Sequence, residues 1–228
     1  KIALMSGIET LEVTGISDTT TGVIDLTDVT GLVTLDAKFA VGQGMISASN
    51  VADGVKVKVT SATTLDNLVV DLTNKSSATN AVDLEFTAVT AANGAGVSGF
   101  ETIDISGANS ATINLNNFAN NTFTGILITE ETATETVQNI ASGSTVTIGG
   151  GATAITAATD LTATVKNAGI AGHNSDSLNF AIVGTVAVDV GTLVVANTES
   201  ITVDAGGLAT GNSIAVLTAD AATNLTLT

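Results

Sequence analysis

Short runs of alternating apolar and polar residues recur along the chain. Examples are VKVKVT (55–60), LVVDLT (68–73) and VDLEFT (82–87), each bounded by tracts rich in Gly, Asn, Ser or Thr. Successive side chains of a strand point to opposite faces, so this alternation predicts short strands with one buried face. Further strands are predicted at 23–27, 32–37, 102–106, 112–116, 125–129, 145–148, 161–166, 178–183, 186–190 and 193–195. One stretch differs: EETATE (130–135) predicts one or two helical turns near 131–140.

A short phrase recurs at wide intervals. It reads GIETLEVTG at 7–15, GFETIDISG at 99–107 and, weakened, NTESITVDAGG at 197–207. Its glutamates, Glu9, Glu101 and Glu199, are 92 and 98 residues apart. Recurrence at such an interval is typical of an internally duplicated protein.

A second correspondence supports the duplication. LVVDLTNKSSATNAVDLEF (68–86) matches LTATVKNAGIAGHNSDSLNF (161–180): each is a strand, a polar tract and a second strand ending in Phe. Phe86 and Phe180 are 94 residues apart, within the interval of the glutamates. We therefore expect one elongated segment of a larger protein, with a first copy at 1–96, a second at 97–196 and a truncated third at 197–228.

Two all-β architectures fit strands of this spacing. Two-residue hairpin signals between closely spaced strands are mostly lacking, and a parallel β-helix, or β-solenoid, needs none. Small side chains such as Ala, Val, Thr and Asn also stack well from coil to coil. Tandem antiparallel β-sandwich domains are the alternative, although such domains usually carry a core Trp or Tyr and this chain has neither. The sequence favours the solenoid.

Charge narrows the range of partners. Among the 228 residues, 22 are acidic and only 6 are basic, which gives a net charge of −16. This balance argues against binding to nucleic acid or to an anionic membrane surface. No apolar run approaches the roughly 18 residues of a transmembrane helix, so membrane insertion is not expected. Divalent cations fit the charge better, since calcium takes oxygen ligands from carboxylates, amides and carbonyls.

The sequence offers no recognisable catalytic set. The chain has no Cys, and its one histidine, His173, lies in the Gly- and Asn-rich stretch GHNSD. No nucleophile can therefore be paired with a base. The glycine-rich pieces are not followed by the GK[ST] of a phosphate loop. Acidic residues are spread evenly and aromatics are only 3%, so no sugar-binding platform is evident. We expect a protein that is not an enzyme.

Calcium is the remaining chemical question. Neither the GGxGxDxUx nonapeptide of β-rolls nor an EF-hand loop occurs. Oxygen-bearing residues at predicted turns are the candidate metal ligands, with an affinity of about 10⁻⁴ to 10⁻³ M. They are Asp18, Asp25, Asp28, Asp53, Asn174 and Asp176.

Each of these residues has an alternative role. Asp and Asn side chains in turns often bond nearby backbone groups instead of a metal. Asparagines of a solenoid can also stack in ladders along the axis and satisfy one another's hydrogen bonds. Asn114 and Asn116 in TINLN are candidates for such a ladder.

The phrases GIETLEVTG and GFETIDISG, with segments such as NSDSLNF and ATNAVDLEF, resemble surface-layer proteins of Gram-negative bacteria. The resemblance implies type I secretion, a β-solenoid region that self-assembles into a cell-surface lattice, and calcium-dependent assembly. The expected partners are further copies of the chain and cell-surface polysaccharide, and the expected location is the outside of the bacterial cell. Large repetitive adhesins have a similar composition and give the alternative function. A third, less favoured hypothesis is that the chain is a β-helical carbohydrate-active enzyme.

Overall fold

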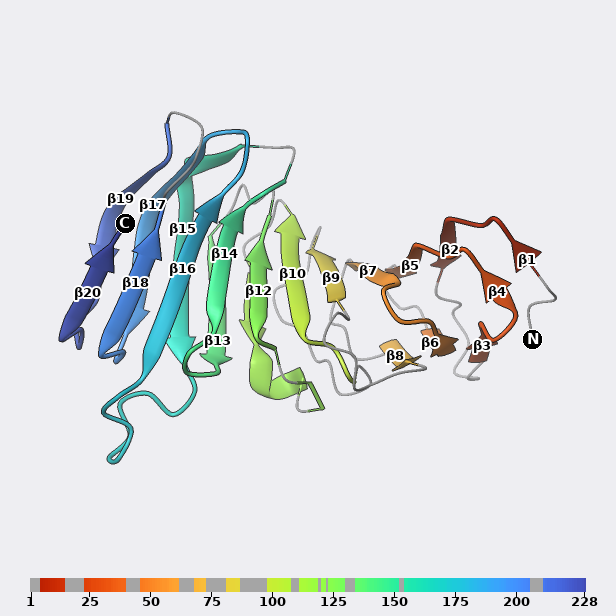
Figure 1. Ribbon diagram of the computed structural model, residues 1–228, viewed down its shortest axis with the longest axis horizontal. Helices are drawn as coiled ribbons and strands as arrows, with labels where there is room; N and C mark the ends of the chain where they lie inside the picture. The colour runs from red at the N-terminus through yellow and green to blue at the C-terminus, as the bar shows by residue number, and fades with distance from the viewer. Residues whose placement is uncertain are drawn as a thin grey trace.

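The computed structural model describes residues 5–14, 23–39, 46–61, 68–72, 81–86, 98–107, 111–118, 120–121, 123–129, 134–151, 154–205 and 211–228. Across these ranges the chain forms twenty strands and a single 3-10 turn. Every strand pairing described is parallel, and no hairpin joins consecutive strands. The strands stack coil upon coil as a β-solenoid (Figure 1), which confirms the favoured architecture and excludes the sandwich alternative.

One ten-stranded sheet runs the length of the solenoid. Its strands, in spatial order, follow the order of the chain, with one strand from each coil. They are β2 (Thr10–Thr14), β5 (Thr34–Phe39), β7 (Lys56–Ser61), β9 (Ala81–Phe86), β10 (Thr102–Gly107), β12 (Gly125–Ile128), β14 (Thr145–Gly149), β16 (Ser177–Val183), β18 (Ser200–Asp204) and β20 (Asn224–Leu227).

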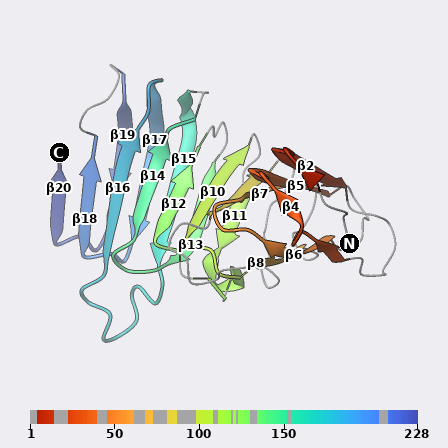
Figure 2. The same cartoon turned by 45° about the vertical axis from the view of Figure 1, so that its right-hand side comes forward.

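The alternate strands build the other side. A three-stranded sheet contains β3 (Val23–Asp25), β6 (Ile46–Val51) and β8 (Leu68–Leu72). A five-stranded sheet contains β11 (Ala111–Asn114), β13 (Glu135–Ile140), β15 (Ile155–Val165), β17 (Val188–Ala196) and β19 (Ser213–Thr218). A small pair joins β1 (Met5–Ser6) to β4 (Val29–Thr30). Figure 2 shows the five-stranded sheet as a layer separate from the ten-stranded one.

Each coil takes up a similar length of chain. Thr10 pairs with Thr34, Thr102 with Gly125 and Ser200 with Asn224, intervals of 23 or 24 residues. The coil from Thr145 to Asn179 is longer, at 34 residues. It contains the loop that protrudes between β15 and β16 at the lower left of Figure 1. From β2 to β10, and again from β10 to β18, the chain makes four coils, so successive phrase glutamates stand four coils apart.

The three phrase glutamates precede a strand of the same sheet and make the same backbone contacts. In each, the glutamate carbonyl accepts hydrogen bonds from two successive N–H groups of the next coil. The pairs are Val33 and Thr34 on Glu9 (2.8 and 2.9 Å), Thr124 and Gly125 on Glu101 (2.9 and 3.2 Å), and Thr223 and Asn224 on Glu199 (2.8 and 2.9 Å). The phrase therefore marks a recurring point at which the chain enters the ten-stranded sheet.

Inward side chains stack into apolar ladders. Leu35, Val57, Ile103, Ile126 and Val146 occupy one register position on five coils of the sheet and are fully buried. The second side contributes its own buried positions to the same core cluster. Parallel stacking places each apolar residue on its counterpart one coil away, so the period-two pattern becomes a continuous core.

The helical expectation near 131–140 is wrong. Residues 135–140 form β13, and Glu135, 1% exposed, occupies an inward position in register with Leu161. Because an acidic side chain stands at a core position, the alternation of apolar and polar residues in ETVQNI is hard to recognise in the sequence. Residues 130–133 lie outside the described ranges. In the described part of the chain, no helix has the length and hydrophobicity of a membrane span.

Candidate functional site

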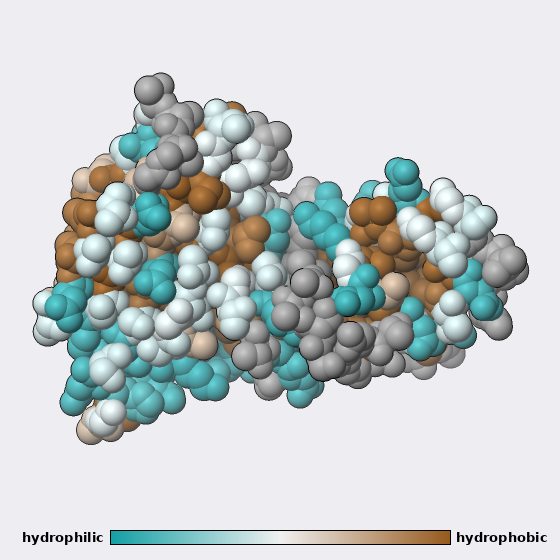
Figure 3. Space-filling model, viewed as in Figure 1, coloured by the Kyte–Doolittle hydropathy of each residue, from teal (hydrophilic) through white to brown (hydrophobic). Residues whose placement is uncertain are grey.

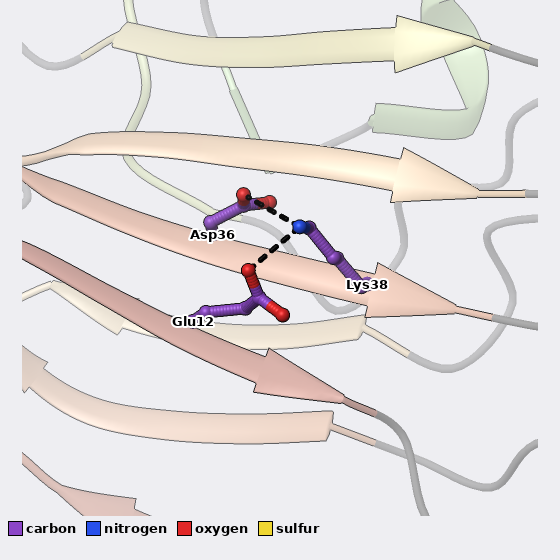
Figure 4. Close-up of polar contacts among 3 residues, drawn as sticks. All are labelled: Glu12, Asp36 and Lys38. Atoms are coloured by element: carbon purple, nitrogen blue, oxygen red, sulfur yellow. Dashed lines mark hydrogen bonds and ion pairs between the residues drawn. The ribbon is translucent and has the colours of Figure 1, made fainter.

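A group of charged side chains lies on the outer face of the first coils. Lys38 on β5 stands between Glu12 on β2 and Asp36 on its own strand, as Figure 4 shows. Its Nζ is 2.6 Å from Glu12 Oε2 and 3.7 Å from Asp36 Oδ2. The hydrogen bond to Glu12 is the main cause that raises the pKa of Lys38 above 10.5.

Strand register brings these charges together. Glu12 pairs with Asp36, which pairs with Lys58, and all three alternate with inward apolar residues. Two strands farther on, Asp104 on β10 is 3.7 Å from Lys56 Nζ and accepts a hydrogen bond from Thr129 Oγ1 at 2.7 Å. The outer position of Lys56 and Lys58 follows from the alternation of VKVKVT.

In this group Lys38 is the counter-ion of the carboxylates of Glu12 and Asp36, and the arrangement differs from that of a metal centre. The ammonium of Lys38 occupies the position between two carboxylates where a cation would bind. Asp36 is buried, and its Oδ1 has no hydrogen-bond partner in the described part of the chain. A lysine already supplies positive charge to the carboxylates, so a divalent ion would have to displace it.

The first group of predicted calcium ligands lies near the turn after β3. Asp25 Oδ1 accepts hydrogen bonds from Thr27 N (3.0 Å), Thr27 Oγ1 (2.6 Å) and Asn50 Nδ2 (3.0 Å). This is the side-chain capping that competes with metal binding at such residues. Asp25 therefore fixes a turn and ties it to the next coil.

Asp28 and Asp53 lie in equivalent turns on neighbouring coils. The turn at 26–29 is closed by Val29 N on Leu26 O at 3.0 Å, and the turn at 52–55 by Val55 N on Ala52 O at 3.3 Å. Both aspartates also have a polar or electrostatic partner. Asp18, predicted with them, lies outside the described residues.

The second predicted group lies at the end of the loop before β16, away from the first. Asn174 is exposed, whereas Asp176 is only 6% exposed. Asp176 N donates to Glu199 Oε2 at 2.9 Å, and its carbonyl accepts from Glu199 N and Ser200 N. Its Oδ2 is buried without a hydrogen-bond partner among the described residues. Glu199 was not among the predicted ligands, because its proximity depends on the stacking of two coils.

In the described ranges, no three acidic, histidine or cysteine side chains come close enough to hold a metal ion. Calcium needs about six to eight oxygen ligands. Asp176 and Glu199 supply two carboxylates, one of them already committed to a backbone N–H. These two carboxylates by themselves therefore supply only part of the ligand set that calcium needs.

An asparagine contact between coils is repeated on the second side. Asn139 Nδ2 donates to Asn114 Oδ1 at 2.8 Å, as Asn50 does to Asp25. Asn139 and Asn50 both have positive φ, 61° and 57°, which asparagine tolerates better than most residues. The ladder prediction is confirmed for Asn114. The Asn116 side chain is exposed, and its backbone N–H donates a hydrogen bond to Asn114 Oδ1 at 3.0 Å.

His173 is exposed in the protruding loop, where its backbone N–H donates to Ile170 O at 3.0 Å.

Comparison with known proteins finds no matching protein-family model, curated protein or solved structure. The resemblance to surface-layer proteins therefore stays a prediction.

Proposed function

We propose that the chain is a structural segment of a secreted bacterial surface-layer protein that self-assembles at the cell surface. The observation that carries this proposal is the ten-stranded parallel sheet, which runs through the described coils without a change of strand order. Such a stack is quasi-one-dimensional: each coil contacts its neighbours, and the whole presents long, regular faces. A lattice component needs such a repeating surface more than it needs a pocket.

The outer face suits contact between copies mediated by polar groups. Figure 3, which is viewed onto the second half of the ten-stranded sheet and onto the side of the first coils, shows hydrophilic and intermediate residues with hydrophobic areas between them. The net charge of −16 opposes close approach of two copies. Calcium would relieve this repulsion by bridging carboxylates of different copies, for which the partly exposed Glu199 beside Asp176 is a candidate.

The experiment is electron microscopy with light scattering on the chain in calcium, in magnesium and after chelation. We expect ordered assemblies in calcium that disperse on chelation, with magnesium less effective. Asp176→Asn tests the calcium contact, since it should shift the calcium midpoint without preventing folding. A dispersed monomer in every condition would refute the proposal.

A further inference from the structure

A pocket lies beside the 3-10 turn η1 (Leu115–Phe118), where the chain leaves the five-stranded sheet. Its volume is about 200 Å³. Phe118 and Phe123 form part of its apolar wall, and Asn116, Asn121, Asn139 and Lys166 supply its polar groups. Residues from successive coils line the pocket, so it forms only when β11, β13 and β15 stack on one another.

The wall of the pocket is held in place by defined contacts. The Phe118 and Phe123 rings meet edge to face, with centroids 5.8 Å apart and planes at 69°. Asn121 is fixed at both ends: Oδ1 accepts from Phe100 N at 2.9 Å, and Nδ2 donates to Phe118 O at 3.1 Å. Asn139 is held by its bond to Asn114. A pocket that is already ordered spends less binding free energy on ordering its own side chains.

Lys166 gives the pocket a distinct electrostatic character. It is the only lysine between residues 76 and 228, and the chain has no arginine. Its backbone N–H donates to Ile140 O at 2.7 Å, which fixes its position next to Asn139. Within the described ranges Lys38 and Lys56 have acidic partners, but no ion pair involves Lys166. None of the described residues that line the pocket carries a carboxylate, although the protein as a whole is strongly acidic.

Size and chemistry together limit the ligand. Pockets for drug-sized molecules measure roughly 300–1,000 Å³, so a pocket of this volume suits a single small ring. An exposed ammonium matches one carboxylate, and the side-chain amides match hydroxyl groups, which both donate and accept. Apolar side chains can contact the C–H face of such a ring. A sugar ring that carries one carboxylate has all three features.

We propose that this pocket binds one acidic sugar residue, a hexuronate, with its carboxylate on Lys166 and its hydroxyls on Asn116 and Asn139. The proposal is independent of lattice formation, because the pocket lies at the corner next to η1 and is not lined by Asp176 or Glu199, the residues of the proposed calcium contact. A chain that binds a hexuronate without assembling, or assembles without binding one, would separate the two proposals.

The test is a titration of the isotope-labelled chain with galacturonate, followed by amide chemical shifts in calcium-free buffer. We expect saturable shifts around 115–123, 139–141 and 166, with a dissociation constant in the millimolar range. Lys166→Ala should weaken binding roughly tenfold, the size expected for loss of one charged hydrogen bond. Lys166→Arg should retain most of it. Lys56→Ala, which removes the same charge from the outer face of the first coils, should leave the affinity unchanged.

Neutral glucose and acetate serve as the comparison ligands. Both should bind at least severalfold more weakly than galacturonate, because each lacks one of the two recognised features. Glucose binding as tightly as galacturonate would overturn the role of Lys166. Acetate binding as tightly would overturn the sugar assignment and leave a simple anion site. Absence of shifts near the pocket, or an affinity unchanged by Lys166→Ala, would overturn the proposal altogether.

Discussion

The first and last coils share a backbone plan but differ in what they show to solvent. The first five strands of the ten-stranded sheet, β2 to β10, contain eight charged residues, whereas the last five, β12 to β20, contain only Asp204. The register position that holds Glu12, Asp36 and Lys58 in the first half holds Leu127, Thr147 and Ala181 in the second. The outer face therefore varies freely while strand pairing is conserved along the stack.

The cores differ in the opposite sense. Among the side chains that the structure describes, buried positions of the first half include Ala37 and Ala48, while the second half buries Phe118, Phe123 and Phe180. Burial of large aromatic side chains contributes more hydrophobic stabilisation than burial of alanine. In the described part of the chain, the second half therefore has aromatic packing in its core, and the first half adds charge pairing between strands on the outside.

Loss of a core aromatic should reduce the free energy of unfolding most, and the destabilisation should be confined to the neighbouring coils. Phe180→Ala is expected to cost about 3–5 kcal/mol, because Phe180 is buried in the second half. Coils contact only their neighbours, so amide hydrogen exchange should rise in β14, β16 and β18 more than in β5 and β7. Phe180→Leu is the control and should lose less. Equal loss of protection in both halves would show that the solenoid unfolds as one unit.

Asparagines at the coil corners should have intermediate effects that are similar in the two halves. Asn50→Ala and Asn139→Ala each remove an inter-coil hydrogen bond and place alanine at positive φ, so a loss of about 1–2 kcal/mol is expected for each. Urea unfolding measures it. Asn→Gly at the same positions keeps the backbone relaxed and should recover part of the loss. Alanine variants as stable as the parent would contradict this account of the corners.

The charged group of the first half should give the smallest effect, and a pH-dependent one. The pKa of Lys38 is raised in the folded state, so its contribution is complete below pH 10.5 and is lost as pH rises through the folded value. Melting temperatures of the parent and of Lys38→Met should therefore converge in alkaline solution. Glu12→Gln removes the main cause of the raised pKa and should make the pH dependence smaller, while Asp36 still favours the charged form of Lys38. The contribution is small because these side chains are exposed.

Strand positions and the solenoid could be predicted from sequence, because alternation reports directly on which face is buried. VKVKVT and LVVDLT, for instance, predict β7 and β8 closely. The failure at β13 has a physical cause: Glu135 occupies a core position, so local polarity misrepresents burial. The length of one coil was also hidden, because the recognisable phrase returns only every fourth coil and the intervening coils differ in sequence.

The candidate sites were less predictable, because they depend on contacts between residues more than 20 positions apart. The bonds from Lys38 to Glu12 and from Asp176 to Glu199 follow from register, which an isolated turn does not reveal. Asp25 illustrates the reverse problem. Its turn was identified correctly, but its carboxylate binds Thr27 and Asn50, and residue type alone could not show this.

The near-constant coil length has a mechanical consequence. Hydrogen bonds between parallel strands point along the stacking axis, so tension applied along that axis passes through the strand interfaces in series, and the interfaces break one at a time. Each coil that peels away frees about 23 residues, or roughly 80 Å of extended chain. The molecule would lengthen in equal steps under load, with a single larger step where the coil before β16 carries its additional loop.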